Sequence, residues 1–592
     1  MNTTNSFPQP TLLERSFPRT TRTLLETYAT PAYQGYQLEA WVFDDEAERQ
    51  ATETAFNDAG INARLRSAYK PLVHFFLETF SWASVQSVVI EYPVLAQAPR
   101  RFLLEAYPLA ALLPQGVSLR WEGVETTPAS TAPVHYRVQV ERRGKGWETH
   151  VVTAPNRHHQ DHVGEAQYSP CGWLRLTSPQ GDVSESRLET DYEALFQAAM
   201  ATLASTQWQS APPYFEELNF TVHWPSRDRR LAWDDEHISL SEALHEELYF
   251  STLEYFQRRA GLALGDRSIQ PGQIVPEVST QGEAAYLQIS LRPLAVFSAE
   301  RDDVALENAQ QAIGTAQIKP VMAALGGQAL YATTRAGRAV EARYLLGSDR
   351  AVMISAGQHA NETSGVVGAL RAAQQLCGAP GAHFVISPLE NPDGYALQHR
   401  LIAAQPRHMH HAARYTAFGN DLQSQPLGRP FEHAIREQAI ETSGAELHIN
   451  LHGYPAHEWT RPLNGYVPRG FEMWTIPKGF FLILRHQPGW EAAAKQLVGT
   501  VTQQLAQVPG LVAFNATQID LFETHAGALT FPVVNGFPYL LSEDPDQLTP
   551  LMLITEYPDE TVTGDAFVQA HTAQMATVIA AYHAFQTLSL NR

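Results

Sequence analysis

The sequence predicts an α/β fold for the C-terminal half of the chain, with a mixed, largely parallel sheet covered by helices on both faces. From about residue 303 onward, short apolar runs alternate with helical patterns, which is the order expected when helices cover both faces of a sheet. The apolar run 351–355 is short enough for a buried parallel strand. Polar residues that can carry chemistry follow three of these runs, at the strand ends where such sheets bind ligands.

The elements of this half follow one another in a regular order. The predicted helices are residues 304–325, 365–376, 431–442 and 490–505. The predicted strands are residues 329–334, 340–345, 351–355, 383–387, 446–451 and 551–555. Together they define one predicted domain, residues 303–592.

For the part of the chain before residue 303, the sequence predicts an α+β region of one or two domains. Its predicted strands are residues 37–43, 61–67, 86–92, 135–141, 148–153 and 285–291, and its predicted helices are residues 44–58, 71–80 and 241–259. Residues 126–133, Thr-Thr-Pro-Ala-Ser-Thr-Ala-Pro, have the composition of a linker. We therefore expect an N-terminal domain over residues 1–125 and a second α+β region over residues 126–302.

The composition limits the classes of partner. The chain has 592 residues, with 42 lysines and arginines, 62 aspartates and glutamates, and a formal net charge of −20. Such a surface repels phosphate backbones, so we expect no nucleic acid partner. Neither a signal peptide nor an apolar run of membrane-spanning length occurs, so we expect a cytoplasmic protein with no membrane partner. The oligomeric state stays open.

Several catalytic classes are disfavoured. Cys171 and Cys377 form no C-x-x-C pair, which argues against a thiolate zinc site and a disulfide framework. The chain has no G-x-S-x-G elbow and no phosphate loop of the G-x-x-x-x-G-K type. Nucleophilic hydrolases and nucleotide enzymes of these types are therefore not indicated.

The first candidate metal-binding segment follows the predicted strand 351–355. The sequence Gly-Gln-His-Ala-Asn-Glu places His359 and Glu362 where a tight loop or a first helical turn can direct both toward one point. Imidazole and carboxylate are both zinc ligands, and a catalytic zinc usually takes three protein ligands and a water. The pair alone also fits a simple helix start, in which Glu362 faces the helix dipole.

A second segment, Glu-Leu-His-Ile-Asn-Leu-His-Gly, ends in His452. Strand alternation puts His448, Asn450 and His452 on one face. His452 stands at the carboxyl end, where a ligand faces substrate, whereas His448 lies deeper and is interpreted as a hydrogen-bonded core histidine.

A third segment is the apolar run 551–555, which leads to Glu556. A glutamate at a strand end is usually only solvated. Beside a zinc-bound water it becomes a natural general base, because the metal lowers the pKa of the water and the carboxylate accepts its proton.

Together these segments resemble the zinc metallocarboxypeptidase family, the carboxypeptidase A-like peptidases. The order of the motifs is that of the family: H-x-x-E, the segment Asn-Pro-Asp-Gly-Tyr at residues 391–395, an arginine followed by a G-x-D unit, the strand-end histidine and the late glutamate. The spacing from Arg414 to the G-x-D unit is similar to that of the cytosolic branch. The resemblance covers about residues 305–592 and implies a carboxypeptidase-like fold there.

The resemblance also implies the metal ligands. It implies that one Zn²⁺ per chain is held by His359, Glu362 and His452. It further implies that Asp421, at the place of an aspartate behind the ligands, orients His359.

The resemblance implies three more roles around this metal. Glu556 would be the general base and later the acid that protonates the leaving amine. Arg414 would polarise the scissile carbonyl and stabilise its oxyanion. Tyr539 matches a mobile tyrosine that closes over substrate, and an ordinary packed tyrosine is an equally good interpretation.

The sequence departs from the family at one point that concerns substrate recognition. The family reads D-x-N-R where this chain has Asp421-Leu-Gln-Ser, so Gln423 and Ser424 stand at the positions that grip the substrate carboxylate. The bidentate arginine clamp is missing there. Either another arginine, Arg461 or Arg485, supplies it, or the substrate is not recognised as a free C-terminus.

Two other segments are rich in histidine. Residues 407–411, Arg-His-Met-His-His, precede Arg414 and either line the cleft or lie on the surface. Residues 158–162, His-His-Gln-Asp-His, are interpreted as a solvated loop, with adventitious metal binding as the alternative.

The leading functional hypothesis is therefore a zinc metallopeptidase that acts on a peptide or small amide substrate. The missing arginine motivates an alternative, a deacylase or amidohydrolase of a small acylated amino acid or modified peptide. A third hypothesis is an inactive binding or scaffold protein, against which the complete set of ligands and base argues.

Overall fold

The structure is a computed structural model that describes residues 10–127, 133–294 and 303–588. Its C-terminal half is built on a nine-stranded sheet with the order β17-β18-β20-β19-β21-β25-β22-β24-β23. The strands are β17 (Gln328–Thr333), β18 (Ala339–Leu345), β19 (Val352–Ala356), β20 (Phe384–Ser387), β21 (Leu447–Tyr454), β22 (Phe481–His486), β23 (Val533–Val534), β24 (Phe537–Glu543) and β25 (Leu551–Pro558). The predicted α/β class is confirmed.

The four central strands of this sheet, β20, β19, β21 and β25, are parallel to one another. On either side, β18 and β22 pair antiparallel with this centre. The outermost pairs, β17 with β18 and β23 with β24, are also antiparallel, while β22 and β24 are parallel. The sheet is thus mixed, as predicted, and its parallel strands are concentrated in the centre. There the carboxyl ends of the strands meet at one edge of the sheet.

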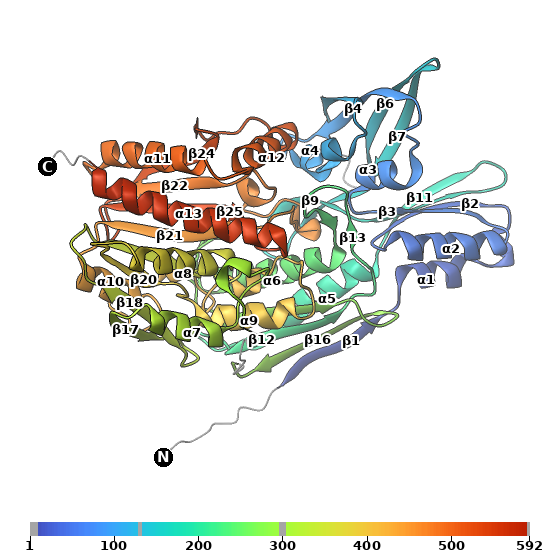
Figure 1. Cartoon of the computed structure of the whole chain (residues 1–592). Coiled ribbons are helices and arrows are strands. Elements are labelled where there is room, and N and C mark those ends of the chain that lie inside the picture. Colours follow the sequence, from blue (N-terminus) through green and yellow to red (C-terminus); the bar gives the residue numbers. More distant parts are fainter. Residues whose placement is uncertain (1–9, 128–132, 295–302, 589–592) are drawn as a thin grey trace.

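Helices cover both faces of this sheet. The helices of this half are α7 (Thr315–Ala324), α8 (Ser364–Cys377), α9 (Pro392–Ile402), α10 (Ala434–Ser443), α11 (Glu491–Leu505), α12 (Leu511–Ala526) and α13 (Asp565–Thr587). Helices α8, α11 and α13 pack on one face against alternate strand residues such as Ile354, Ile449 and Leu553. Figure 1 shows α13 running between α8 and α11. Helix α10 packs on the other face against Met353 and Val385.

The N-terminal half contains three four-stranded sheets, with the orders β1-β16-β12-β15, β11-β10-β2-β3 and β5-β4-β6-β7, among its described residues. Its strands are β1 (Thr11–Phe17), β2 (Gln37–Val42), β3 (Asn62–Ser67), β4 (Val85–Val94), β5 (Ser118–Glu125), β6 (Val134–Arg142), β7 (Gly146–Ala154), β8 (Asn156–Gln160), β9 (Ala166–Pro170), β10 (Gly172–Thr177), β11 (Val183–Leu188), β12 (Glu217–His223), β13 (Arg229–Arg230), β14 (His237–Ile238), β15 (Gln273–Ser279) and β16 (Ala285–Arg292). Its helices are α1 (Thr20–Tyr28), α2 (Glu46–Asp58), α3 (Pro71–His74), α4 (Arg101–Glu105), α5 (Asp191–Ser205) and α6 (Leu240–Arg259).

Helix α6 lies between the N-terminal sheets and the C-terminal half (Figure 1). Ser239 caps it by accepting a hydrogen bond from the amide of Glu242, and almost all of its residues are buried. One continuous core contains Leu244 and Leu248 of α6 together with Ala412 and Trp459 of the C-terminal half. The N-terminal region therefore packs directly on the loops that follow the central strands.

Two predicted features differ from the structure. Residues 304–325 do not form one helix, because α7 begins only after Gly314, and a short 3₁₀ turn precedes it. Strand β4 lies before the domain boundary predicted at residue 126 and strand β6 after it, yet the two strands pair in one sheet. Most of the predicted linker lies outside the described residues. The division into three domains stays a prediction. Among the described helices, none is long and apolar enough to cross a bilayer.

Candidate metal centre and active site

The loop between β19 and α8 carries the first two candidate ligands. Gly357 follows β19 directly with a φ of 62°, a conformation that favours glycine. A Cβ atom there would lie 2.9 Å from Leu389 Cδ1, so the close approach also requires glycine. The turn directs His359 and Glu362 toward each other, with His359 Nδ1 2.8 Å from Glu362 Oε1.

The third candidate ligand, His452, comes from β21. The register of the sheet places it opposite Glu556 of β25. His452 Nδ1 lies 2.9 Å from Glu362 Oε2 and 3.0 Å from His359 Nδ1. The three side chains are buried and their ligand atoms all lie within 4.8 Å of one another.

This set of donors fits a zinc ion. Two imidazole nitrogens and two carboxylate oxygens converge on one point, and Glu362 Oε2 is buried without a hydrogen bond. Burial lowers the pKa of His452 to about 4, so that its imidazole is neutral at pH 7 and can act as a ligand. Two histidines and a glutamate are a known catalytic zinc set that leaves one position for water.

The surrounding charges also favour a cation. Glu556, Asp559 and Glu560 are buried near Glu362, and Arg414 is the basic side chain that approaches this group most closely among the described residues. Burial and the neighbouring Glu362 carboxylate raise the pKa of Glu556 and of Glu560 well above the ordinary range, and the pKa of Asp559 to about 7. A divalent ion would offset this excess of negative charge.

Asp421 lies behind the first histidine, where the resemblance expects it. Its Oδ2 is 3.4 Å from His359 Nε2. Its other oxygen accepts hydrogen bonds from Gln358 Nε2 at 3.1 Å and from the amide of Gln423 at 3.0 Å. The aspartate can therefore hold the ring of His359 with Nδ1 directed at the metal position.

Arg414 follows a short 3₁₀ turn and reaches the same centre. Its Nη1 donates to Glu362 Oε1 at 2.7 Å and lies 3.6 Å from Glu560 Oε1. Its buried Nε has no hydrogen-bond partner among the described residues. One N–H donor of this arginine is thus available beside the metal ligands.

Glu556 projects from β25 and is 8% exposed. Lys478 is a second basic group, and no sequence motif marks it. Its positive charge opposes the rise in the pKa of Glu556. Burial lowers the pKa of Lys478 to about 7, and its ammonium lies 4.9 Å from the ring centre of Tyr454. The general-base candidate therefore sits between the metal ligands and a buried lysine.

A cavity of about 160 Å³ lies beside this centre. Its lining includes most of the predicted site residues, namely His359, Arg414, Asp421, Gln423, His452 and Glu556. Four aromatic side chains, Tyr454, Trp459, Phe471 and Trp474, form part of the wall. Met409 and His411 also line it, so the segment 407–411 contributes to the cleft rather than to an open surface.

The predicted substrate-binding residues are not all brought together. Gln423 lines the cavity, and its Oε1 accepts a hydrogen bond from Arg436 Nη1 at 2.8 Å. Ser424 is not part of the cavity lining. Tyr539 pairs with Leu482, whose side chain lies in the core under the helices, so Tyr539 packs on the face opposite the cavity. The structure does not support its role as a closing tyrosine.

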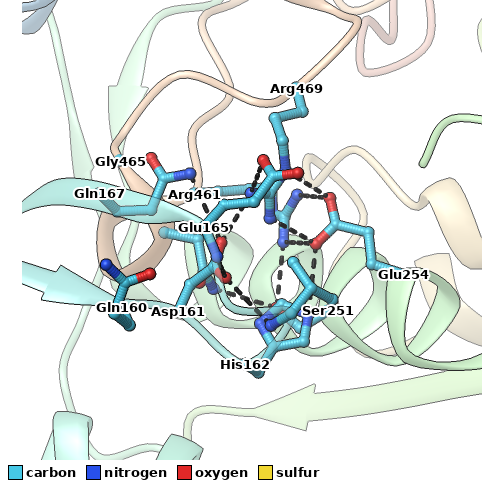
Figure 2. Close-up of polar contacts among 12 residues, drawn as sticks. Gln160, Asp161, His162, Glu165, Gln167, Ser251, Glu254, Arg461, Gly465 and Arg469 are labelled. Atoms are coloured by element: carbon cyan, nitrogen blue, oxygen red, sulfur yellow. Dashed lines mark hydrogen bonds and ion pairs between the residues drawn. The ribbon is translucent and has the colours of Figure 1, made fainter. Parts of the chain in front are cut away.

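Arg461, one of two arginines considered as a replacement clamp, is held elsewhere. Figure 2 shows His162, Arg461 and Arg469 converging on Glu254 of α6. Arg461 Nη1 and Nη2 donate to the two oxygens of Glu254 at 2.7 and 3.0 Å. Arg469 donates to Glu254 and to Asp161. His162 is therefore part of a buried polar network and not of a solvated loop, and Arg461 is not free to bind substrate.

Arg485, the other arginine considered, does line the cavity. The alternation of β22 puts it on the same face as Ile483, and the register places it opposite Met552 of β25. Among the described residues it has no ion-pair partner. A further arginine, Arg267, reaches the cavity from the N-terminal half and lies 3.6 Å from Asp421 Oδ2. No local motif marks this position in the sequence.

Comparison with known proteins gives matches to solved structures and to one family model. Among solved structures, the chain is similar to a metallo-carboxypeptidase from Burkholderia cenocepacia, with 13% identity and a TM-score of 0.29 over 52% of this chain and 77% of that chain. It is also similar to the carboxypeptidase A from Helicoverpa armigera, with 11% identity and a TM-score of 0.30 over 57% of this chain and 94% of that chain. No curated protein matches the chain.

One family model matches part of the chain. Residues 337–454 match the model described as zinc carboxypeptidase. This segment contains His359, Glu362, Arg414, Asp421 and His452, while Glu556 lies beyond it. The nearness to the cytosolic branch stays a prediction. The match over residues 337–454 confirms the resemblance to the zinc carboxypeptidase family that the motifs indicate.

Proposed function

We propose that the chain hydrolyses a peptide or amide bond at a zinc ion held by His359, Glu362 and His452. The observation that carries the proposal is the convergence of these three buried side chains beside Glu556, which stands opposite His452 in the neighbouring strand. Zinc, when bound, supplies polarisation of a carbonyl group and a lowered pKa of a water molecule.

The protein residues then have separate tasks. Glu556 accepts the proton of the attacking water and later donates it to the leaving amine, a role for which a buried carboxyl with a raised pKa is suited. Arg414 directs its free Nε–H toward the carbonyl oxygen and stabilises the charge that develops there. Asp421 keeps His359 in the orientation that ligation requires.

Substrate recognition in this proposal uses Arg485 instead of an arginine at position 424. Arg485 and Glu556 face the same cavity, from positions four residues apart in the register of β22 and β25. Four residues of strand separate the backbone positions of Arg485 and Glu556 by about 13 Å. An extended arginine side chain covers about half of this distance toward Glu556. The remaining gap between the guanidinium and Glu556 accommodates about one residue of substrate. We propose that Arg485, assisted by Gln423, binds the carboxylate of a C-terminal residue.

The small volume of the cavity and the serine at position 424 favour a second candidate, a deacylase of a small acylated amino acid. Such a substrate also presents one carboxylate next to the amide that is hydrolysed. Turnover of acylated amino acids without turnover of longer peptides would support this candidate against a carboxypeptidase.

The first test replaces the general base. Glu556→Gln keeps the shape of the side chain but cannot accept a proton, so we expect kcat to fall by about 10²–10⁴-fold while the zinc content is unchanged. Glu543→Gln, at an exposed carboxylate on β24, is the matched control and should retain full activity. Metal-loaded Glu556→Gln protein with wild-type kcat would refute the proposed mechanism.

A further inference from the structure

A second group of histidines and carboxylates lies at the start of α6, apart from the cavity lining described above. It consists of His237, Glu242 and His457, with Asp228 and His408 next to them. The group joins β14 and α6 of the N-terminal half to two loops of the C-terminal half. None of these five residues has a task in the proposed hydrolysis.

The geometry around Glu242 repeats that around Glu362. Glu242 Oε1 is 2.7 Å from His457 Nε2, and Oε2 is 2.9 Å from His237 Nε2. In the first centre the corresponding two distances from the carboxylate of Glu362 are 2.8 and 2.9 Å. In both places one buried carboxylate presents each oxygen to a different imidazole.

The remaining ring nitrogens are held as they are in metal-binding histidines. His457 Nδ1 is 3.1 Å from Thr561 Oγ1 and 3.6 Å from Asp235 Oδ2. His237 Nδ1 is 3.4 Å from the backbone carbonyl oxygen of Asp235. Partners of this kind fix the tautomer in which Nε2 keeps its lone pair for a metal.

The charge and burial of the group also suit a cation. Glu242 and His457 are buried, and the side chain of His237 is 7% exposed. Asp228 lies on the wall of a neighbouring cavity of about 490 Å³, which gives a route from solvent.

We propose that His237, Glu242 and His457 bind a second divalent transition-metal ion of the zinc type, with a structural role. Two imidazole nitrogens and a carboxylate oxygen are donors that zinc prefers. The ion would fix the loops that carry Met409, His411 and Trp459, which line the cavity of the first centre. The inference rests on this geometry alone and does not require the proposed hydrolysis.

The experiment measures zinc per chain by elemental analysis after reconstitution and removal of loosely bound metal. Two ions per wild-type chain are expected, and one in His359→Ala/His452→Ala protein, which loses the first centre. Adding Glu242→Gln to that variant should remove the remaining ion. When Co²⁺ replaces zinc, the His359→Ala/His452→Ala protein should show visible absorption, and adding Glu242→Gln should abolish it.

Two single variants locate the ion and guard against misfolding. The single variant His457→Gln should lose one ion. When His457→Gln is combined with His359→Ala/His452→Ala, the Tm of the protein should no longer rise on addition of zinc. His408→Gln should keep the ion, because His408 belongs to the adjacent pair with Asp228. The proposal is overturned if the His359→Ala/His452→Ala protein binds no zinc, or if His408→Gln and not His457→Gln removes it. Unchanged binding in folded Glu242→Gln protein would overturn it equally.

Discussion

Arg485 is the single residue whose replacement should change substrate choice without disturbing the metal. A charge-assisted hydrogen bond contributes about 1.5–3 kcal/mol, so Arg485→Leu should lower kcat/KM for peptides with a free C-terminus by about 10- to 100-fold. For the same peptides with amidated C-termini, we expect no further loss. The measurement is mass-spectrometric cleavage of paired free-acid and amidated peptides.

The control for this experiment is Arg429→Leu, at an exposed arginine outside the cavity. It should leave both rates unchanged. Equal losses on free-acid and amidated peptides in Arg485→Leu protein would show that Arg485 does not bind the carboxylate.

At this scale, the sequence indicated the residues that stand at strand ends or in the family's motifs, and it missed residues in loops without a motif. His452 and Glu556 could be placed because a buried strand directly precedes each of them. Arg267 and Lys478 lie in loops with no local pattern, and only the packing of the chain brings them to the site. For Tyr539 the sequence left two interpretations open, and the structure agrees with the packed tyrosine, because Tyr539 packs against the core under the helices.

At the scale of elements, α12 contacts the N-terminal half through His525, and this contact should depend on pH. His525 Nδ1 is 3.1 Å from the carbonyl oxygen of Leu103, and its Nε2 accepts a hydrogen bond from the amide of Ala110 at 3.3 Å. Burial lowers the pKa of His525 to about 3, whereas an unfolded histidine titrates near pH ~6.5. Between these two pH values the imidazole of His525 is protonated in the unfolded chain but not in the folded protein. The stability that the neutral His525 contributes is therefore fully present above pH ~6.5 and is lost as the pH falls.

The test compares urea unfolding of wild-type and His525→Gln proteins at several pH values between about 7 and 5. One proton changes the free energy of unfolding by at most about 1.4 kcal/mol per pH unit. Glutamine can make both hydrogen bonds without titrating, so the variant should show a slope smaller by up to this amount. Identical slopes would mean that His525 is not the group that titrates.

The prediction of elements succeeded where the apolar pattern and the helix signals agreed. Strand β19 and helix α8 could be recognised because a continuous apolar run ends in a glycine that precedes an amphipathic segment. The predicted helix 304–325 was too long, because its apolar spacing continues through Gly314, where the backbone is extended. Spacing alone does not show where a helix begins when no capping side chain marks the position.

At the scale of the whole molecule, the network around Glu254 holds the two halves of the chain together. The carboxylate of Glu254 is shared by Arg461 and Arg469, and Arg461 is 1% exposed. Glu254→Ala should therefore remove the bidentate partner of a buried arginine, whose remaining ion pair is a 3.6 Å contact with Glu247, and lower the free energy of unfolding by about 3–5 kcal/mol. Chemical denaturation measures the loss, and limited proteolysis shows whether α6 separates from the C-terminal half.

A matched control is Glu165→Ala, because Glu165 pairs with Arg469 at the exposed edge of the same network. Exposed ion pairs contribute about 0–1 kcal/mol, so its effect should be small. Equal effects of the two substitutions would show that the buried pair does not join the halves.

The role of the N-terminal half could not be predicted from the sequence. No motif recognised in that half marks its contacts with the cavity: Arg267 faces the cavity itself, and α6 supports the loops that line it. These contacts join residues far apart along the chain, and local patterns carry no information about them. The sequence could therefore indicate the metal centre but not the residues of the N-terminal half that line the cavity beside it.

The central claim is that hydrolysis depends on a metal held by His359, Glu362 and His452. The most direct measurement follows cleavage of a mixed peptide and acyl-amino-acid library by the purified chain, by the same chain after removal of metal with a chelator, and after zinc is restored. We expect cleavage to be lost with the metal, to return with zinc, and not to return in His452→Ala protein. Full cleavage by protein that elemental analysis shows to be free of metal would contradict it.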